Sequence, residues 1–154
     1  MHRLEREQLI PRPVAEVFPF FADASNLEAL TPPWLHFRIV SPLPIEMKAG
    51  AAIEYRLRLL GIPFGWQTRI LEWDPPRKFI DVQARGPYRR WIHLHTFEPH
   101  PGTDGREWTR MRDAVDYEVG WGPFGALAHP FFVKPSLKRI FDYRRARIEA
   151  LLAK

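Results

Sequence analysis

The chain has 154 residues, of which 45% are hydrophobic and 14% aromatic, so we expect one domain over residues 1–154 with a sizeable core. It has no cysteine, which excludes disulfides and thiolate chemistry, and its formal net charge at pH 7 is +5. No apolar run approaches the roughly 18 residues of a membrane span, and the charged start MHRLEREQ is unlike a signal peptide; we therefore expect a cytoplasmic protein without an integral membrane segment.

The first elements along the chain are a strand and two short helices. Residues 3–10 alternate loosely and favour a strand that ends at Pro11. Apolar residues then recur at helical spacing over residues 13–22, and we expect Pro19 to bend or shorten this helix. A second short helix, capped by Ser25 or Asn26, ends before Thr31-Pro32-Pro33.

The middle of the chain predicts six strands separated by short turns. Their expected ranges are 37–41, 52–60, 66–73, 78–85, 90–98 and 107–119. Residues 52–60 show the clearest alternation, with apolar and charged side chains at successive positions, which is typical of a sheet with one face in water. Short connections favour antiparallel order.

The end of the chain predicts a long helix. Residues 126–132 are compatible with a helix start, but Pro130 and Pro135 leave its continuity with the last helix open. From Pro135 to Leu152 the apolar residues recur every three or four positions: Leu137, Ile140, Phe141, Ile148, Leu151 and Leu152. A helix of about 18 residues is about 27 Å long, and it needs a broad surface to cover this stripe.

These elements together predict an α+β fold. We expect a seven-stranded curved antiparallel sheet wrapped around a long C-terminal helix, with two short helices after strand 1. A bent sheet and a helix match only in part, so a cavity is expected between them.

Five segments resemble the START-related, birch-pollen-allergen-like superfamily, also grouped as SRPBCC or polyketide cyclase/dehydrase proteins. They are the p-x-E-V-F-like opening at 13–18, Leu-Thr-Pro-Pro at 30–33, and residues 79–98, 111–117 and 140–144. Residues 79–98 are similar to the signature F-x-D-x-Q-x-x-G-P-Y-x-x-W-x-H-x-H-x-F-E of a bacterial subgroup, although Val82 replaces a commonly acidic residue. The resemblance implies a helix-grip fold. Because the superfamily includes lipid carriers, hormone receptors and cyclases, it implies no single activity.

His93 and His95 are the first candidate functional residues. Two positions apart in a strand, they project from one face at a separation of about 6–7 Å. The phase of the strand does not decide whether that face is the inner one. Three interpretations stay open: contact with a ligand, two of the ligands of a metal whose third is not evident from spacing, and structural hydrogen bonding.

Asp113 is the second candidate, because it lies on the same strand face as Met111, Val115 and Tyr117. A carboxylate on such a face is costly to bury unless it is paired, and a histidine or an arginine across the sheet would suit. The pairing fits acid–base catalysis and a structural ion pair equally. Asp81 and Gln83 share the face of Phe79 and have the same ambiguity.

The main hypothesis is a protein that binds a hydrophobic small molecule, such as a lipid or polyketide-like compound, without a cofactor or a metal. The predicted ligand-binding residues are Tyr55, Leu57, Trp66, Gln83, Trp91, His93, His95, Met111, Asp113, Tyr117 and Phe141. The alternative is a cyclase/dehydrase-type enzyme that uses His93 or His95 with Asp113 as acid–base groups. A third hypothesis is an interaction module. The basic residues of the chain are too dispersed to favour binding of nucleic acid, but transient contact with a membrane surface stays open.

Overall fold

A computed structural model describes residues 1–59 and 61–153. In that part of the chain the strands are β1 (His2–Ile10), β2 (Arg38–Ile39), β3 (Ala52–Leu59), β4 (Ile62–Asp74), β5 (Lys78–Arg85), β6 (Tyr88–Pro101) and β7 (Glu107–Val119). The α-helices are α1 (Val14–Ala22), α2 (Leu27–Leu30), α3 (Pro123–Ala128) and α4 (Lys134–Leu152). Shorter helical turns are η1 (Ala24–Asn26), η2 (Pro33–Leu35) and the π-helical η3 (His129–Val133).

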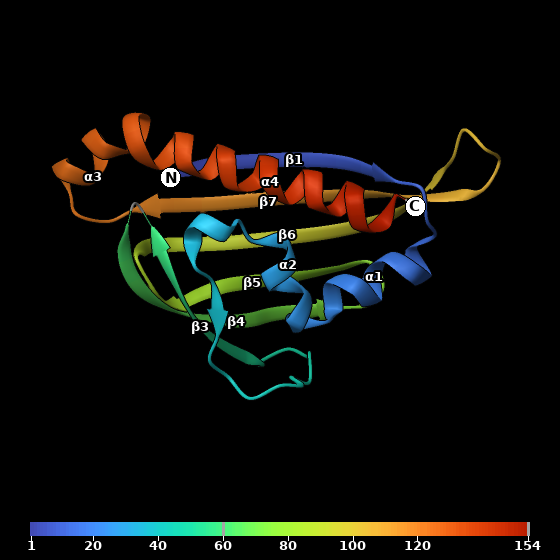
Figure 1. Ribbon diagram of the computed structural model, residues 1–154, viewed down its shortest axis with the longest axis horizontal. Helices are drawn as coiled ribbons and strands as arrows, with labels where there is room; N and C mark the ends of the chain where they lie inside the picture. The colour runs from blue at the N-terminus through green and yellow to red at the C-terminus, as the bar shows by residue number, and fades with distance from the viewer. Residues whose placement is uncertain (60, 154) are drawn as a thin grey trace.

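The strands form one antiparallel sheet in the order β1-β7-β6-β5-β4-β3-β2. Helix α4 runs along β1 and β7, and α1 and α2 lie over the strands beyond (Figure 1). The predicted seven-stranded sheet, the long C-terminal helix and the short helices after the first strand are therefore confirmed. No helix in the described part of the chain is both long and apolar enough to cross a membrane.

The phase of the central strands, which the sequence left open, is fixed by burial. In β6 the residues Trp91, His93, His95 and Phe97 are buried, and the residues between them are partly exposed. In β7 the buried set includes Asp113. Both histidines and this carboxylate therefore lie on the inner, concave face.

Helix α4 buries a stripe that differs from the predicted one at three positions: Ile140 is only partly buried, Leu151 is exposed and Arg144 is added. Its buried residues are Leu137, Phe141, Arg144, Ile148 and Leu152, at spacings of three and four. Leu151, which was assigned to the stripe, is 37% exposed because the following Leu152 occupies the inward position. Arg144, which the sequence did not place in the stripe, is buried with it.

The chain is helical from Pro123 to Leu152, so the predicted start at 126–132 does continue into the last helix. Pro130 and Pro135 each stand in the first turn of a new segment, where a missing backbone N–H is tolerated. Between α3 and α4 the chain adopts a π-helical turn, in which Pro130 is accommodated without ending the helix. Likewise α1 continues past Pro19, which is exposed, to Ala22.

Three strands, β2, β4 and β6, differ from their predicted ranges by more than one residue, and β6 extends over Tyr88–Pro101 where 90–98 was predicted. The last residue of the predicted strand 52–60 lies outside the described residues. Strand β2 covers only Arg38–Ile39, because His36 adopts a left-handed conformation just before it. Strand β4 begins at Ile62 and not at Trp66, since Gly61, at φ 79°, allows a tight reversal that pairs Leu59 with Ile62.

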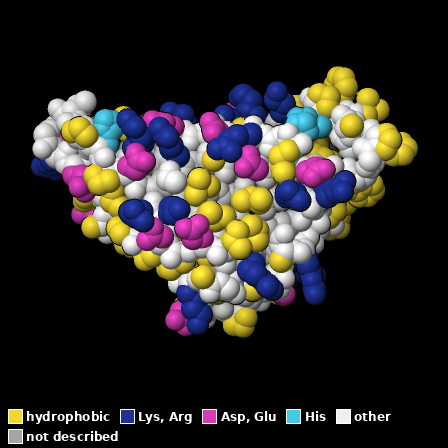
Figure 2. All heavy atoms as spheres, turned by 180° about the vertical axis from the view of Figure 1, so that it is seen from behind, with side chains coloured by type: hydrophobic (Ala, Val, Ile, Leu, Met, Phe, Trp, Pro, Cys, Tyr) yellow, Lys and Arg dark blue, Asp and Glu magenta, His cyan; other side chains and the backbone are white. Residues whose placement is uncertain are grey.

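The core consists of two apolar clusters that α4 connects. One joins α1 to Phe79, Phe97 and Met111, and receives Ile148 and Leu152. The other joins Leu57, Trp66, Trp91, Val115 and Tyr117 to Leu137 and Phe141. Arg144 lies between the two sets on α4. On the surface, basic and acidic side chains are interspersed, as one face in Figure 2 shows.

Candidate functional site

A cavity of about 180 Å³ lies between the sheet, α2 and the first half of α4. Its wall is mostly apolar and includes Leu35, Leu57, Trp66, Trp91, Leu137 and Phe141. The charged and imidazole side chains that line it are Asp23, Asp81, His93, His95 and Arg144. Four of these five, all but Asp23, gather where β5 and β6 meet α4.

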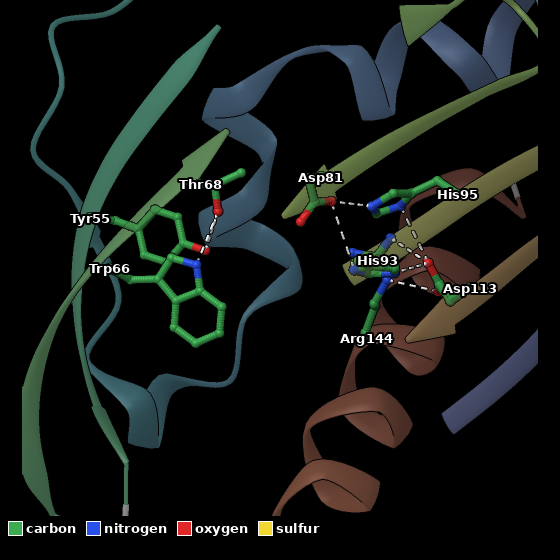
Figure 3. A network of polar contacts seen from close by, with 8 residues as sticks. All are labelled: Tyr55, Trp66, Thr68, Asp81, His93, His95, Asp113 and Arg144. Carbon is green, nitrogen blue, oxygen red and sulfur yellow. Dashed lines mark hydrogen bonds and ion pairs between the residues drawn. The ribbon is translucent and has the colours of Figure 1, made fainter. Parts of the chain in front are cut away.

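The strand register brings two histidines and two carboxylates together on one face. Asp81 on β5 is directly opposite His93 on β6, and His95 is directly opposite Asp113 on β7. Side chains at directly paired positions lie on the same face of an antiparallel sheet. Two histidines and two carboxylates are therefore contiguous on the inner face of the sheet (Figure 3).

The hydrogen bonds run along the diagonals of this arrangement. Nε2 of His93 donates to Oδ1 of Asp113 at 2.8 Å, and Nε2 of His95 donates to Oδ2 of Asp81 at 2.5 Å. The imidazole rings stack with centroids 3.7 Å apart. Phe79 stacks on the other side of His95 at 4.1 Å, so each ring is held in one orientation.

Arg144 completes the network from α4. Its Nε donates to Oδ2 of Asp113 at 3.1 Å, and its Nη2 donates to Oδ1 at 3.3 Å, which is a two-point contact. The guanidinium also lies over the ring of Phe21, 5.4 Å from its centroid. Burial by itself would raise the pKa of Asp113, but the charge of Arg144 and the histidine hydrogen bonds outweigh it and hold that pKa well below its usual range.

The two histidines have opposite protonation preferences. Burial, followed by the proximity of His95, lowers the pKa of His93. Burial also acts to lower the pKa of His95, but its contacts with Asp113 and Asp81 outweigh it and raise that pKa. Hydrogen bonding and charge from the histidines likewise lower the pKa of Asp81 against the effect of burial. With His93 neutral and His95 protonated, two positive charges balance two negative ones.

A neutral His93 has one defined tautomer. Its Nε2 must carry the proton, since the carboxylate of Asp113 can only accept. Nδ1 is then an acceptor, and it lies 3.9 Å from Oδ2 of Asp81, beyond hydrogen-bond distance. His93 and Asp81 both line the cavity, so this side of the network can accept hydrogen bonds.

A second polar group lies on the opposite wall, on β3 and β4. The hydroxyls of Tyr55 and Thr68 are 2.9 Å apart, and Nε1 of Trp66 donates to Oγ1 of Thr68 at 3.1 Å. Burial raises the pKa of Tyr55, which keeps its hydroxyl protonated. The hydrogen bond between the two hydroxyls uses the proton of one of them, and the proton of the other is left to donate. This group can therefore donate as well as accept.

Seven of the eleven predicted ligand-binding residues line the cavity: Tyr55, Leu57, Trp66, Trp91, His93, His95 and Phe141. The other four lie outside its wall. Asp113 is behind the histidines, and Met111 packs against the cluster around α1. Gln83 bonds the backbone O and N of Tyr88 with its amide, and the hydroxyl of Tyr117 bonds Nε2 of His129. Contact of the seven with a ligand stays a prediction.

Sequence reasoning missed Arg144 and gave Asp81 no role. Arg144 follows Phe141 by three positions and precedes Ile148 by four, so the spacing of the apolar stripe could have identified it. Asp81 could not be assigned without the register that sets it opposite His93. Tyr88 also lines the cavity, and burial raises the pKa of its hydroxyl.

Asp81, His93 and His95 are also the residues that could hold a metal ion. One ligand atom from each falls within a group no wider than 4.8 Å. Metal-binding histidines commonly donate their second N–H to a carboxylate, as His93 does to Asp113. Against this, Nε2 of His95 and Asp81 already share a proton, and that bond would have to break. The donor set fits a metal, but the protonated network already pairs Nε2 of His95 with Oδ2 of Asp81 without one, and Nδ1 of His93 is left to accept.

The sequence matches, over residues 1–153, the family described as "Polyketide cyclase / dehydrase and lipid transport". No curated protein gives a significant sequence match. Solved structures with the same fold include the Zhui aromatase/cyclase from Streptomyces sp. R1128, with a TM-score of 0.74 at 14% identity over 97% of this chain and 92% of that one.

Two further structures share the helix-grip fold. A START superfamily protein from Mycobacterium smegmatis has a TM-score of 0.68 at 12% identity, over 98% of this chain and 99% of that one. The ginseng major latex-like protein 151 from Panax ginseng has a TM-score of 0.65 at 13% identity, over 99% and 98%. Identities this low establish a shared fold and no shared ligand.

Proposed function

The chain belongs to the polyketide cyclase/dehydrase and lipid transport family, and we propose that it binds an apolar small molecule with polar substituents in the cavity between the sheet and α4. The observation that carries this proposal is the composition of the cavity wall. It is mostly apolar, yet it includes acceptors at His93 and Asp81 and a hydroxyl donor at Tyr55 and Thr68. Ligand sites typically combine an apolar wall with a few polar groups that fix orientation.

The volume restricts what can be enclosed. At about 180 Å³ the cavity is slightly larger than the roughly 150 Å³ that accepts benzene in an engineered core. It is smaller than the range of about 300–1,000 Å³ that is typical of sites for drug-sized ligands. We infer that about one ring of the ligand is enclosed. A longer lipid or polyketide-like compound requires part of the wall, such as α2 or the loop with Met47, to move outward.

The polar groups specify the substituents. A hydroxyl or phenol on the ring donates to Nδ1 of His93 or to Asp81, and a carbonyl or second hydroxyl at the other end accepts from Tyr55 or Thr68. Such a ligand satisfies buried groups that would otherwise lack a partner, which favours it over a plain hydrocarbon by the cost of an unpaired buried group, about 1–3 kcal/mol.

The experiment is to identify compounds that remain bound after purification and to measure binding of a panel of single-ring phenols, hydroxyketones and plain alkylbenzenes by calorimetry. Phenols or hydroxyketones are expected to bind more tightly than alkylbenzenes of equal size. His93→Gln should remove most of that preference, whereas Met111→Leu, which is outside the cavity, should leave it unchanged. The proposal is wrong if no apolar compound binds, with or without polar substituents.

A second candidate function is an enzyme of the cyclase/dehydrase type, and the tautomer of His93 favours it. Asp113 holds Nε2–H of His93, which leaves Nδ1 unprotonated on the side of the cavity, while the protonated His95 lies one ring away. This geometry suits removal of a proton next to a carbonyl and return of a proton to oxygen. Turnover of an enolisable polyketone that His93→Gln abolishes would support catalysis. Ligand binding without turnover would support a carrier.

A further inference from the structure

A second surface of the protein has properties that the cavity does not explain. Large apolar side chains gather on α3, on η3 and just before them, with exposed fractions from 57% at Phe132 to 78% at Phe124. We refer to this set as the apolar tip: Trp121, Phe124, Leu127, Phe131 and Phe132. Isolated exposed apolar residues are ordinary, but five within twelve positions are not.

The apolar tip lies at one end of the molecule. In Figure 1, α3 extends beyond the start of β1 and the end of β7. In the reverse view of Figure 2, hydrophobic side chains gather at the corresponding end and project outward. The surface is therefore a rounded protrusion and not a groove.

The segment is held in place by contacts on its inner side, so it cannot turn these side chains inward. Gly125 is buried against the carbonyl of Gly120, where a side chain at Gly125 would come within 1.9 Å of the oxygen. His129 bonds the hydroxyl of Tyr117 at 2.7 Å and stacks on His2 with centroids 3.4 Å apart. Val133 packs against the core.

Trp121 gives an independent sign that exposure is built in. Its backbone has φ of 74°, a left-handed conformation that is unfavourable for a bulky side chain, and it is 75% exposed. No packing in the described structure compensates this strain by burying the indole. Strained residues of this kind cluster where the conformation serves a function.

The charge around the apolar tip is positive. From Val119 to Phe141 the sequence contains no acidic residue and three basic ones, Lys134, Lys138 and Arg139. Lys138 is paired with Asp142, and the guanidinium of Arg139 lies over the ring of Trp34, 4.9 Å from its centroid. Neither Lys134 nor Arg139 makes an ion pair among the described residues. A cationic border around exposed Trp, Phe and Leu is complementary to an anionic lipid surface, where aromatic rings are favoured at the interface.

We propose that the apolar tip docks the protein onto the surface of an anionic membrane. A second copy of the chain fits less well, because two such surfaces would bring like charges together. A stable dimer also needs about 800 Å² of complementary surface from each partner, and a rounded tip offers little flat area. This docking does not depend on whether the cavity holds a ligand.

The test is sedimentation of the full chain with vesicles of phosphatidylcholine, with and without phosphatidylglycerol. We expect binding that increases strongly with phosphatidylglycerol and decreases with salt. The double variant Phe124→Ala/Phe131→Ala should lower partitioning at least about tenfold, given the value of burying two aromatic side chains. Lys134→Glu/Arg139→Glu should remove most of the phosphatidylglycerol dependence.

The matched control is Leu71→Ala/Val40→Ala, which removes two apolar side chains that are exposed elsewhere, and it should bind like the unmodified protein. Leu127→Ser is a second tip variant in case the first does not fold. Absence of binding to both kinds of vesicle overturns the proposal, and so does an equal loss in the control. Concentration-dependent dimerisation that the tip variants abolish would overturn it in favour of a second copy.

Discussion

His93 and His95 stack face to face with ring centroids 3.7 Å apart, yet their Nε2 atoms bond carboxylates on different strands. His93 is bonded to Asp113 on β7, whereas His95 is bonded to Asp81 on β5. Two stacked imidazoles in a buried site cannot both carry a charge without strong repulsion, so one proton is favoured for the pair. Burial and the proximity of His95 lower the pKa of His93, whereas contacts with Asp113 and Asp81 raise the pKa of His95, so the proton is favoured on His95.

The first prediction is that stability has a maximum in pH that these two histidines set. The pKa of His95 is raised, so its contribution is complete below the unfolded value of about 6.5 and is lost as pH rises through its folded pKa. The pKa of His93 is lowered, so its contribution is present above about 6.5 and is lost as pH falls through its folded pKa. Urea unfolding at a series of pH values measures the loss of stability on both sides of the maximum, which we call the alkaline limb and the acid limb.

The control separates the two limbs. His95→Gln should flatten the alkaline limb and leave an acid limb, because Asp81 and Asp113 also have lowered pKa values and lose stability as pH falls. Imidazole NMR signals should titrate in two steps, with the higher step mainly on His95. A single step for both rings near 6.5 would contradict the assignment.

The second prediction concerns Arg144. Replacing it with Met leaves the carboxylate of Asp113 buried without its cationic partner, which is expected to cost about 3–5 kcal/mol in the free energy of unfolding. Adding Asp113→Asn to this variant should recover part of the loss, because the uncompensated charge is removed. Arg145→Met, one residue along on the exposed side, should change stability by no more than about 0.5 kcal/mol. Chemical unfolding of the unmodified protein, of Arg144→Met, of Asp113→Asn and of the double variant tests this, with Arg145→Met as the control. Additive effects of the two single variants would show that the ion pair contributes nothing.

The fold was predictable because its elements follow local patterns. Alternation located β3, β5 and β7, and the apolar stripe located α4. Of the boundaries that were wrong, those at β2 and at the start of β4 depend on single backbone conformations at His36 and Gly61 that no periodicity encodes. Leu151 shows the same limit. Spacings of three and four residues admit both Leu151 and Leu152 to the apolar stripe, although Leu151 points outward.

The site was predictable only in part, for a related reason. His93 and His95 share a strand, so their common face follows from a spacing of two. Asp81, Asp113 and Arg144 come from three other elements, and only the register β5-β6-β7 and the rotation of α4 bring them to the histidines. A charged residue at an apolar position of a helix was the available signal for Arg144, and its sequence neighbours Arg145 and Arg147 obscured it.

The third prediction tests the cavity by filling it. Leu57 is buried in its wall, and Leu57→Trp places a larger side chain in the space of about 180 Å³. We expect ligand affinity to fall at least about tenfold, while stability changes by no more than about 1–3 kcal/mol, the usual cost of overpacking. Calorimetry with the tightest phenol of the panel measures the affinity. Met111→Leu is the control, and unchanged affinity in Leu57→Trp would place the ligand elsewhere.

The fourth prediction concerns metal ions at Asp81, His93 and His95. These three side chains have the donor types of a transition-metal site, and their ligand atoms lie within 4.8 Å of one another. A metal would nevertheless displace the proton that His95 shares with Asp81, and it would add two positive charges to a group that is already neutral. We therefore expect added Zn²⁺ or Fe²⁺ to raise the midpoint of thermal unfolding by less than about 2 °C. A metal that does bind at this site, present at 100 times its dissociation constant, would instead add about 2.7 kcal/mol to the free energy of unfolding. Asp113→Asn is the informative variant, because it lowers the basicity of His93 and weakens any metal site that uses Asp113 as the outer partner. A large stabilisation of the unmodified protein that Asp113→Asn reduces would contradict the expectation and identify a metal centre facing the cavity.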